Sequence, residues 1–282
     1  MYEQSNQLIV KEPYLSSFFR VLTSTIVKDV KISFRYRANL IGGLIQVAVF
    51  VISFYLLSIA IDFRDSGAFV HNPGDQALFI FFLSGIIAML FQETALYTPL
   101  NRINRDLYNG TLEYIYSNPS SRYAYYLGGI ISDIIVKQIF VVPMIVLLYF
   151  LTAYSLMFYV ALLFFLVLVI SLGVILSMFA LLFKQVENLV GIFQILFQFV
   201  GGIFIPVQSM PEYLKWVAYA LPFSYAYDLI RYYSFQGNWN PILPLALEWT
   251  MLILSTMIFF ALSILLLRKT EQQVRKSGLH LI

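Results

Sequence analysis

Long runs without a charged residue alternate with short polar stretches along this chain. Residues 38–61 and 138–183 contain no Asp, Glu, Lys or Arg. Because one helical crossing of a bilayer needs about 20 apolar residues, such runs predict membrane-spanning helices. The runs are continuous and lack the period of two that the strands of a membrane β-barrel require. The pattern therefore predicts an all-α integral membrane protein.

Division of these runs predicts six spans, at about 38–61, 77–97, 128–151, 157–183, 189–205 and 242–267. The run at 138–183 is too long for one crossing, and we expect it to break in a short hairpin between Thr152 and Ser155. The spans make 38–267 one transmembrane domain. It follows an N-terminal region at 1–37 and precedes a polar tail at 268–282.

The N-terminal region contains an amphipathic pattern. Between Phe18 and Phe34 apolar residues recur every three or four positions, and basic residues such as Lys28 and Lys31 fall between them. This pattern is typical of a basic helix that lies in the membrane interface. A helix docked on another subunit would show the same pattern, so both interpretations stay open.

The basic residues are distributed unequally between the two sides of the predicted bundle. Fourteen of the 18 lysines and arginines lie on the side of the termini, and only Arg64, Lys215 and Arg231 lie on the other. Basic loops stay in the cytoplasm of most membrane proteins. We therefore expect both termini and the loop at 98–126 to be cytoplasmic, and residues 206–240 to face outward.

Composition excludes several kinds of chemistry. The chain is 60% hydrophobic and 12% charged, whereas soluble domains carry about a quarter charged residues. It has no cysteine, which excludes disulfides and thiol catalysis, and its two histidines, His71 and His280, lie far apart. It also lacks the G-x-x-x-x-G-K-[ST] loop that cradles nucleotide phosphates. We expect no cofactor on this chain and no enzymatic activity of its own.

The predicted cytoplasmic loop contains its own helix-start and helix-stop signals. Pro99 suits a helix start, Asn109-Gly110 suits a helix stop, and Thr111 can cap a second short helix that ends before Pro119. Exposed apolar side chains such as Leu107 would then suit docking on a soluble partner. A loop that only caps the bundle has the same spacing, and the spacing does not decide between them.

The predicted outward-facing stretch has the highest density of glycines and prolines that can end or begin a helix. Gly201-Gly202 and Pro206 end the fifth predicted span, Pro211 can open a short helix, and Pro222 can close it. The stretch fits a re-entrant lid or an ordinary interfacial loop. We expect its charged residues to be solvated rather than catalytic: Glu212, Lys215, Asp228 and Arg231.

Three ionisable residues inside predicted spans are functional candidates: Glu93, Asp133 and Lys137. Glu93 lies near the cytoplasmic end of the second span, and a charge in a span is a functional candidate by default. We expect it to form a structural or coupling ion pair with a neighbouring basic residue; a role in contacting the substrate is the alternative. Asp133 and Lys137 are four residues apart with the acid first, which favours a local pair on one helix face.

Two stretches together resemble a known family. One is R-D-L-Y-N-G-T-L-E-Y-I-Y-S-N-P at 105–119, and the other is G-x-F-x-P at 202–206. The second is followed by further matching positions: Met210, Pro211, Leu214, Pro222, Tyr225 and Arg231. In this order the stretches resemble the ABC-2 type permease, the membrane subunit of ABC exporters whose ATPase is a separate polypeptide.

The resemblance implies roles for particular segments. Residues 101–117 would include the coupling helix that seats in the ATPase, and 14–36 would be the connecting helix. Residues 207–236 would be short re-entrant helices that close the exit. The implied coupling residues are Arg102, Arg105, Asp106, Leu107, Gly110, Thr111, Leu112 and Glu113. The implied outer gate comprises Gly201, Gly202, Pro206, Pro211, Pro222, Tyr225 and Arg231. Glu93 is similar in position to an acidic residue that some relatives use in a polar relay.

The resemblance also implies an assembly in a prokaryotic inner membrane. Two permeases, more often identical than different, would form the path, and two ATP-binding subunits would carry ATP-Mg. The partners would also include membrane lipid but no nucleic acid. We expect a hydrophobic, drug-like or lipid-like substrate; lipid-linked polysaccharide is the alternative. An ion-coupled carrier would need midplane carboxylates and internal repeats, which the sequence does not favour. A non-transporting membrane scaffold is a third possibility.

Overall fold

The regular structure of the chain is helical. The computed structural model describes residues 14–60, 67–71, 74, 76–111, 122–183 and 187–277. In chain order the elements are α1 (Tyr14–Arg35), α2 (Arg37–Ala60), α3 (Ala77–Tyr108), α5 (Arg122–Thr152), α6 (Met157–Phe183), α7 (Glu187–Phe199), the 3-10 turn η1 (Val207–Ser209), α8 (Glu212–Ala220), α9 (Pro222–Ser234) and α10 (Leu245–Ser277). The described part of the chain is therefore all-helical, as its uncharged runs predict.

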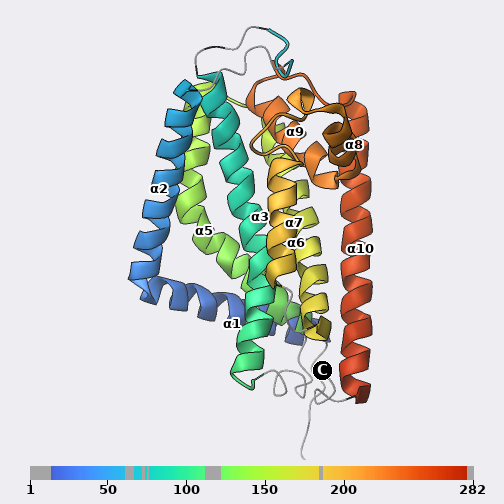
Figure 1. Ribbon diagram of the computed structural model, residues 1–282. Coiled ribbons are helices and arrows are strands. Elements are labelled where there is room, and N and C mark those ends of the chain that lie inside the picture. The colour runs from blue at the N-terminus through green and yellow to red at the C-terminus, as the bar shows by residue number, and fades with distance from the viewer. Residues whose placement is uncertain are drawn as a thin grey trace, which may run out of the picture.

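The long helices run side by side and form a bundle. Helix α1 lies across one end of it, and the short helices α8 and α9 cover the opposite end (Figure 1). We call these the α1 end and the α9 end. In the described ranges, five helices are long and apolar enough to cross a membrane: α2, α3, α5, α6 and α10. The expected break between Thr152 and Ser155 is confirmed, because α5 ends at Thr152 and α6 begins at Met157.

The fifth predicted span differs from the others. Helix α7 has only 13 residues, so at 1.5 Å per residue it extends about 20 Å, less than the roughly 30 Å hydrocarbon core. It stops at a tight turn in which the amides of Ile203 and Phe204 both donate to the Gln198 carbonyl. Gly202 has a φ of 102°, which glycine adopts without strain. The count of six spans therefore stays a prediction.

The expected helix start at Pro99 is wrong. Helix α3 runs through Pro99 without a break for 32 residues, where the sequence led us to expect a span ending near residue 97. A proline removes one backbone hydrogen bond, and helix packing in a bundle can compensate for this loss. Pro99 is indeed buried, and its neighbour Leu100 is fully enclosed. As a result, Arg102 and Asp106 belong to the same rod as Glu93.

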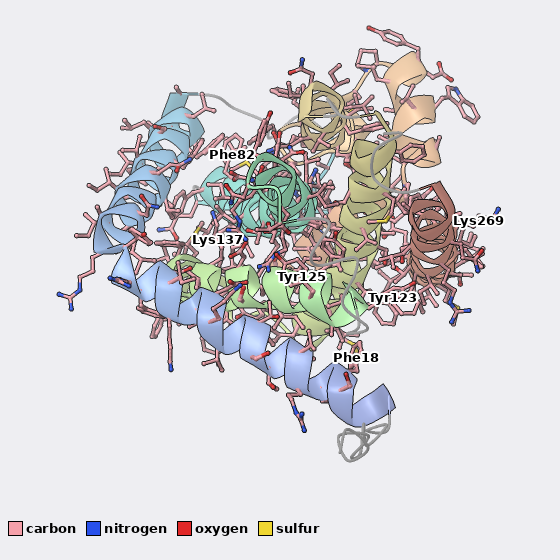
Figure 2. All side chains as sticks on the ribbon, turned by 90° about the horizontal axis from the view of Figure 1, so that it is seen from below. Phe18, Phe82, Tyr123, Tyr125, Lys137 and Lys269 are labelled. Carbon is pink, nitrogen blue, oxygen red and sulfur yellow. The ribbon has the colours of Figure 1, made fainter. Side chains whose placement is uncertain are left out.

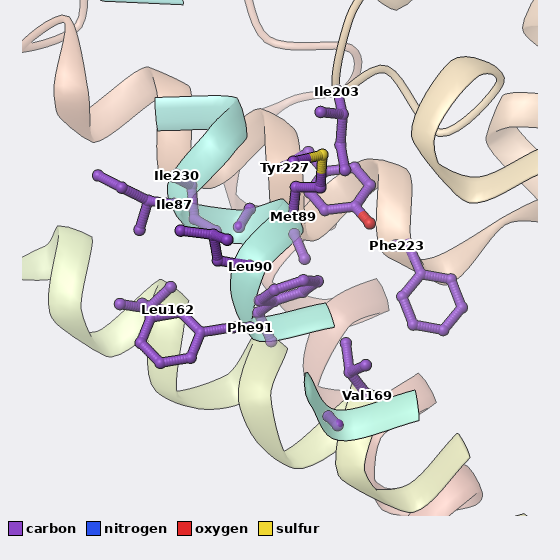
Figure 3. Close-up of a cluster of buried hydrophobic side chains, with 14 of the residues drawn as sticks. Ile87, Met89, Leu90, Phe91, Leu162, Val169, Ile203, Phe223, Tyr227 and Ile230 are labelled. Carbon is purple, nitrogen blue, oxygen red and sulfur yellow. The ribbon is translucent and has the colours of Figure 1, made fainter. Parts of the chain in front are cut away.

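Helix α3 forms the centre of the bundle. Its apolar side chains pack against α6 and α9, as Figure 3 shows for Phe91, Leu162 and Tyr227. Helices α3 and α6 approach closely at Gly173 of α6, where an added Cβ would lie less than 3.0 Å from the carbonyl oxygen of Ala95. In the apolar 18-residue stretch of α3, 83% of the residues are buried inside this chain, whereas in the corresponding stretch of α2 only 6% are buried. The packing of the fold is thus concentrated on α3.

Helix α1 is held against α5 by close backbone contact. An added Cβ at Gly128 would lie 2.9 Å from the Cβ of Thr25 and 3.1 Å from the Leu22 carbonyl oxygen. Glycine in α5 therefore lets α1 cross it directly. The crosswise orientation in Figure 1 fits an amphipathic helix in the membrane interface.

Candidate functional site

A charged network joins three helices at the α1 end. Arg102 of α3 is only 5% exposed and forms an ion pair with Asp29 of α1. Its guanidinium carbon also lies 4.7 Å from the centre of the Tyr125 ring of α5, a favourable cation–π geometry. One side chain of α3 thus contacts both neighbouring helices at this end of the bundle.

The same network reaches the last turn of α3. The hydroxyl of Tyr125 donates to Oδ2 of Asp106 at 2.8 Å. The amide of Thr111 donates to the carbonyl of Asp106 at 2.9 Å, and Gly110 has a φ of 65°. The predicted helix stop at Asn109-Gly110 is therefore confirmed.

The segment that follows the helix stop leaves α3 next to these contacts. The structure describes the chain here as far as Thr111. Two of the predicted coupling residues, Leu112 and Glu113, and the second short helix expected after Thr111 lie outside the described residues. For Leu107 only the backbone is described, within α3.

Gly129 of α5 makes room for the buried arginine. An added Cβ at this position would lie less than 3.0 Å from three atoms of the Arg102 guanidinium group. Any side chain there would push the arginine away from its place between α3 and α5. The pair Gly128 and Gly129 thus serves two purposes, since the first admits α1 and the second admits Arg102.

A cavity of about 420 Å³ opens beside this network. Figure 2, seen from below, shows Tyr125 and Lys137 between α5 and α3. The lining residues come from α1, α3 and α5: Asp29, Ile32, Ser33, Glu93, Thr94, Tyr97, Thr98, Asn101, Arg102, Arg105, Asp133, Val136 and Lys137. The cavity therefore brings the three predicted intramembrane residues together with two of the predicted coupling residues.

The expected local pair of Asp133 and Lys137 is wrong. The hydroxyl of Thr98, on α3, donates to Oδ2 of Asp133 at 2.7 Å, and within the described ranges Lys137 has no carboxylate within ion-pair distance. The Lys137 ammonium instead lies 5.9 Å from the centre of the Phe140 ring. A hydroxyl on the neighbouring helix thus takes the place that helical spacing assigned to the lysine.

The α9 end contains a second polar cluster, and here a prediction fails. Arg231 and Asp228 are each 2% exposed, although we expected both to be solvated. Arg231 donates through Nη2 to the Ile203 carbonyl at 2.6 Å, and its guanidinium carbon lies 3.9 Å from the centre of the Phe81 ring. The arginine therefore ties α9 to the turn after α7 and to α3.

Asp228 organises the chain that leads into α10. It accepts hydrogen bonds from Nε1 of Trp239 at 2.8 Å, from the amide of Ile242 at 2.9 Å and from Nε2 of Gln208 at 3.3 Å. Burial raises the pKa of the Asp228 carboxyl, and these hydrogen bonds act in the opposite direction. Burial also lowers the pKa of Arg231 to about 9, against the attraction of Asp228, so the arginine stays charged at neutral pH.

The predicted gate residues all lie at the α9 end. Gly201, Gly202 and Pro206 form the turn that Arg231 contacts through Ile203. The expected start and end of the short helix are confirmed, since Pro211 directly precedes α8 and α8 ends at Ala220, two residues before Pro222. Pro222 itself begins α9. Tyr225 donates to the Tyr219 carbonyl at 2.6 Å and ties α9 to α8. Their role as a gate stays a prediction.

Replacing Asp228 with alanine should loosen the α9 end. The change leaves the buried donors of Trp239 and Ile242 without an acceptor, so we expect stability to fall by about 2–3 kcal/mol. Thermal unfolding in detergent measures this loss, with Glu212→Ala, which removes an exposed carboxylate of α8, as the control. Because the chain has no cysteine, Ser234→Cys provides a specific label for α9. Equal labelling with and without the Asp228 change would contradict the prediction.

Sequence reasoning missed Asp29 and Tyr125. Asp29 is the only acidic residue in the sequence of α1 and stands beside Lys28, so an isolated acid in a basic helix was a usable signal. Tyr125 lies in a tyrosine-rich stretch with no distinguishing pattern. Its role depends on which face of α5 turns toward α3, and the sequence of α5 alone does not define that face.

Comparison with known proteins gives one family. The family model described as "ABC-2 type transporter" matches residues 17–235. Comparison with curated protein sequences gives no match. The matched region runs from α1 to the end of α9, and it therefore includes both polar clusters.

Proposed function

The chain belongs to the ABC-2 type transporter family, and we propose that it is the permease subunit of an ATP-driven exporter whose ATPase is a separate polypeptide. The family assigns the chain to the membrane permeases of transporters. The step beyond this concerns how energy from ATP enters the membrane domain. The network around Arg102 is the observation that carries the proposal.

Helix α3 is well built to transmit a push along its axis. It is continuous from the core to Tyr108, and Arg102 links it to α1 through Asp29 and to α5 through Tyr125. A force applied to the chain after Asp106 would therefore move three helices together. A permease needs such a mechanical connection between helices if closure of an ATPase is to rearrange its membrane domain.

The proposed assembly follows from this direction of force. The α1 end faces the cytoplasm, where two ATP-binding subunits carrying ATP-Mg contact the segment that follows α3. A second permease, in our proposal an identical chain, completes the path for a hydrophobic, drug-like or lipid-like substrate. The complex lies in the inner membrane of a prokaryote, with both termini cytoplasmic. Most lysines and arginines lie on the side of the bundle that contains the termini, and this distribution supports the orientation.

Charge reversal at Arg105 tests the coupling. Arg105 is exposed on the last turn of α3, so Arg105→Glu should leave the fold intact while repelling an acidic docking partner. We expect transport per ATP hydrolysed to fall about tenfold, equivalent to about 1.4 kcal/mol of coupling. Proteoliposomes that contain the permease and its ATPase allow both rates to be measured.

The matched control is Lys215→Glu, the same reversal on α8 at the far end. It should change neither rate. An unchanged ratio of transport to hydrolysis in Arg105→Glu would contradict the docking role. Transport that survives complete ATP depletion would contradict the proposed function as a whole.

A further inference from the structure

The cavity at the α1 end contains opposite charges that do not neutralise each other. Glu93 and Lys137 are both half-buried and both line it. Within the described ranges, neither of them forms an ion pair or a side-chain hydrogen bond. Charges at membrane depth are normally paired, because leaving water is unfavourable for each of them. Two charges of opposite sign that form no ion pair within the described part of the chain leave this cavity suited to a ligand that pairs with both.

The charge balance of the cavity defines the ligand further. Asp29 and Arg102 form an ion pair, so the charges that remain in the lining are two carboxylates, Glu93 and Asp133, and two cations, Arg105 and Lys137. A simple anion would be repelled by the carboxylates, and a simple cation by the basic groups. A molecule with one amine and one phosphate complements both sets at once.

The surroundings favour an amphiphile over a free zwitterion. Ile32 and Val136 line the cavity beside the charged groups, and Ile32 is 45% exposed. An acyl chain can lie along these side chains while the headgroup occupies the cavity, whose volume of about 420 Å³ suits a small ligand.

We propose that this cavity binds the headgroup of a zwitterionic amphiphile, with the amine at Glu93 and the phosphate at Lys137. This names the substrate class of the transporter and rests on the proposed function only in treating the bound amphiphile as cargo. Asp133 and Arg105 extend the acidic and basic sides of the cavity. The ligand reaches it from the membrane interface, beside α1.

Binding to the purified chain in detergent tests the site without any ATPase. The probes are lysophosphatidylethanolamine, lysophosphatidylglycerol and an alkylammonium of equal chain length, together with free phosphoethanolamine. Isothermal titration should show the zwitterionic amphiphile binding about tenfold tighter than either singly charged one. Free phosphoethanolamine, which lacks the chain, should bind more weakly still. Equal affinity for the three amphiphiles would overturn the proposal, and equal affinity for phosphoethanolamine would overturn its lipid part.

Two variants that each remove one charge locate the site. Glu93→Gln and Lys137→Gln should each weaken binding of the zwitterionic amphiphile about tenfold, since each removes one charge-assisted contact. Glu212→Gln and Lys215→Gln make the same chemical changes on α8 and should leave binding unchanged. Full affinity in both cavity variants would place the ligand elsewhere and overturn the proposal. The wild-type comparison of probes decides the question even if a variant fails to fold.

The result separates the two proposals. ATP-dependent transport without preference for the zwitterionic probe would leave the proposed function standing and remove this site. Preferential binding that both cavity variants weaken, in a chain that never assembles with an ATPase, would establish the site and remove the exporter.

Discussion

Replacing Gly173 with alanine should destabilise the bundle more than any other change of one methyl group proposed for this chain. The new Cβ would collide with the Ala95 carbonyl oxygen, at a distance below 3.0 Å, where α6 crosses α3. The obstacle is backbone, so relief requires the two helices to separate. Overpacking of this kind costs about 1–3 kcal/mol, and we expect the upper part of this range.

Thermal unfolding in detergent measures the effect, and α2 offers a matched control. Gly42 is also helical, but an added Cβ there has no atom within 4 Å. Gly42→Ala should therefore change stability by less than about 0.5 kcal/mol, or raise it slightly through helix propensity. Equal effects of the two substitutions would mean that the contact of α3 with α6 does not limit stability.

Arg102→Met should have an effect at least as large. It removes the positive partner of Asp29, whose side chain is only 12% exposed, and it also removes the cation that lies over Tyr125. Breaking one side of a buried pair typically costs about 3–5 kcal/mol, because the remaining charge is uncompensated. We expect about 3 kcal/mol, together with detachment of α1 from α5.

A double-mutant cycle separates the pair from the rest of the contact. In Arg102→Met with Asp29→Asn no charge is left alone, so the double variant should lose less stability than the sum of the single variants. Arg105→Gln, on the exposed side one turn further along α3, serves as the control. Cysteines introduced in α1 and α5 report on the position of α1, since the chain has none of its own. Strict additivity would show that Arg102 and Asp29 do not act as a pair.

Local signals in the sequence predicted the features that depend on local chemistry. The hairpin after Thr152, the helix stop at Gly110, the helix start after Pro211 and the helix end before Pro222 are all confirmed. Each depends on backbone geometry within a few residues. The all-helical class followed from the uncharged runs for the same reason, because the requirement for internal backbone hydrogen bonds acts on each segment separately.

The errors arose where distant segments decide the outcome. Pro99 continues α3 because the surrounding helices enclose it, and Asp133 bonds to a threonine of another helix. Asp228 is buried because Trp239 and Ile242 return to it after α9 has ended. The polarity of a residue predicts exposure only when nothing folds back over it. The sequence contains the donors that hydrogen-bond to Asp228, but it does not show that the chain folds back and brings them to the carboxylate.

Helix α2 constrains its own sequence very weakly. Only 6% of the residues in its apolar 18-residue stretch are buried within this chain. At most positions of α2, any residue of similar hydrophobicity should therefore be tolerated. Substitution of every position of α2 in turn would then show which positions contact lipid and which contact another protein. Positions that tolerate every apolar side chain face lipid acyl chains. Apart from positions that pack within this chain, such as Gly43 against Phe140, positions that accept only one shape must be recognised by another protein. Their spacing along α2 would outline the footprint of that protein.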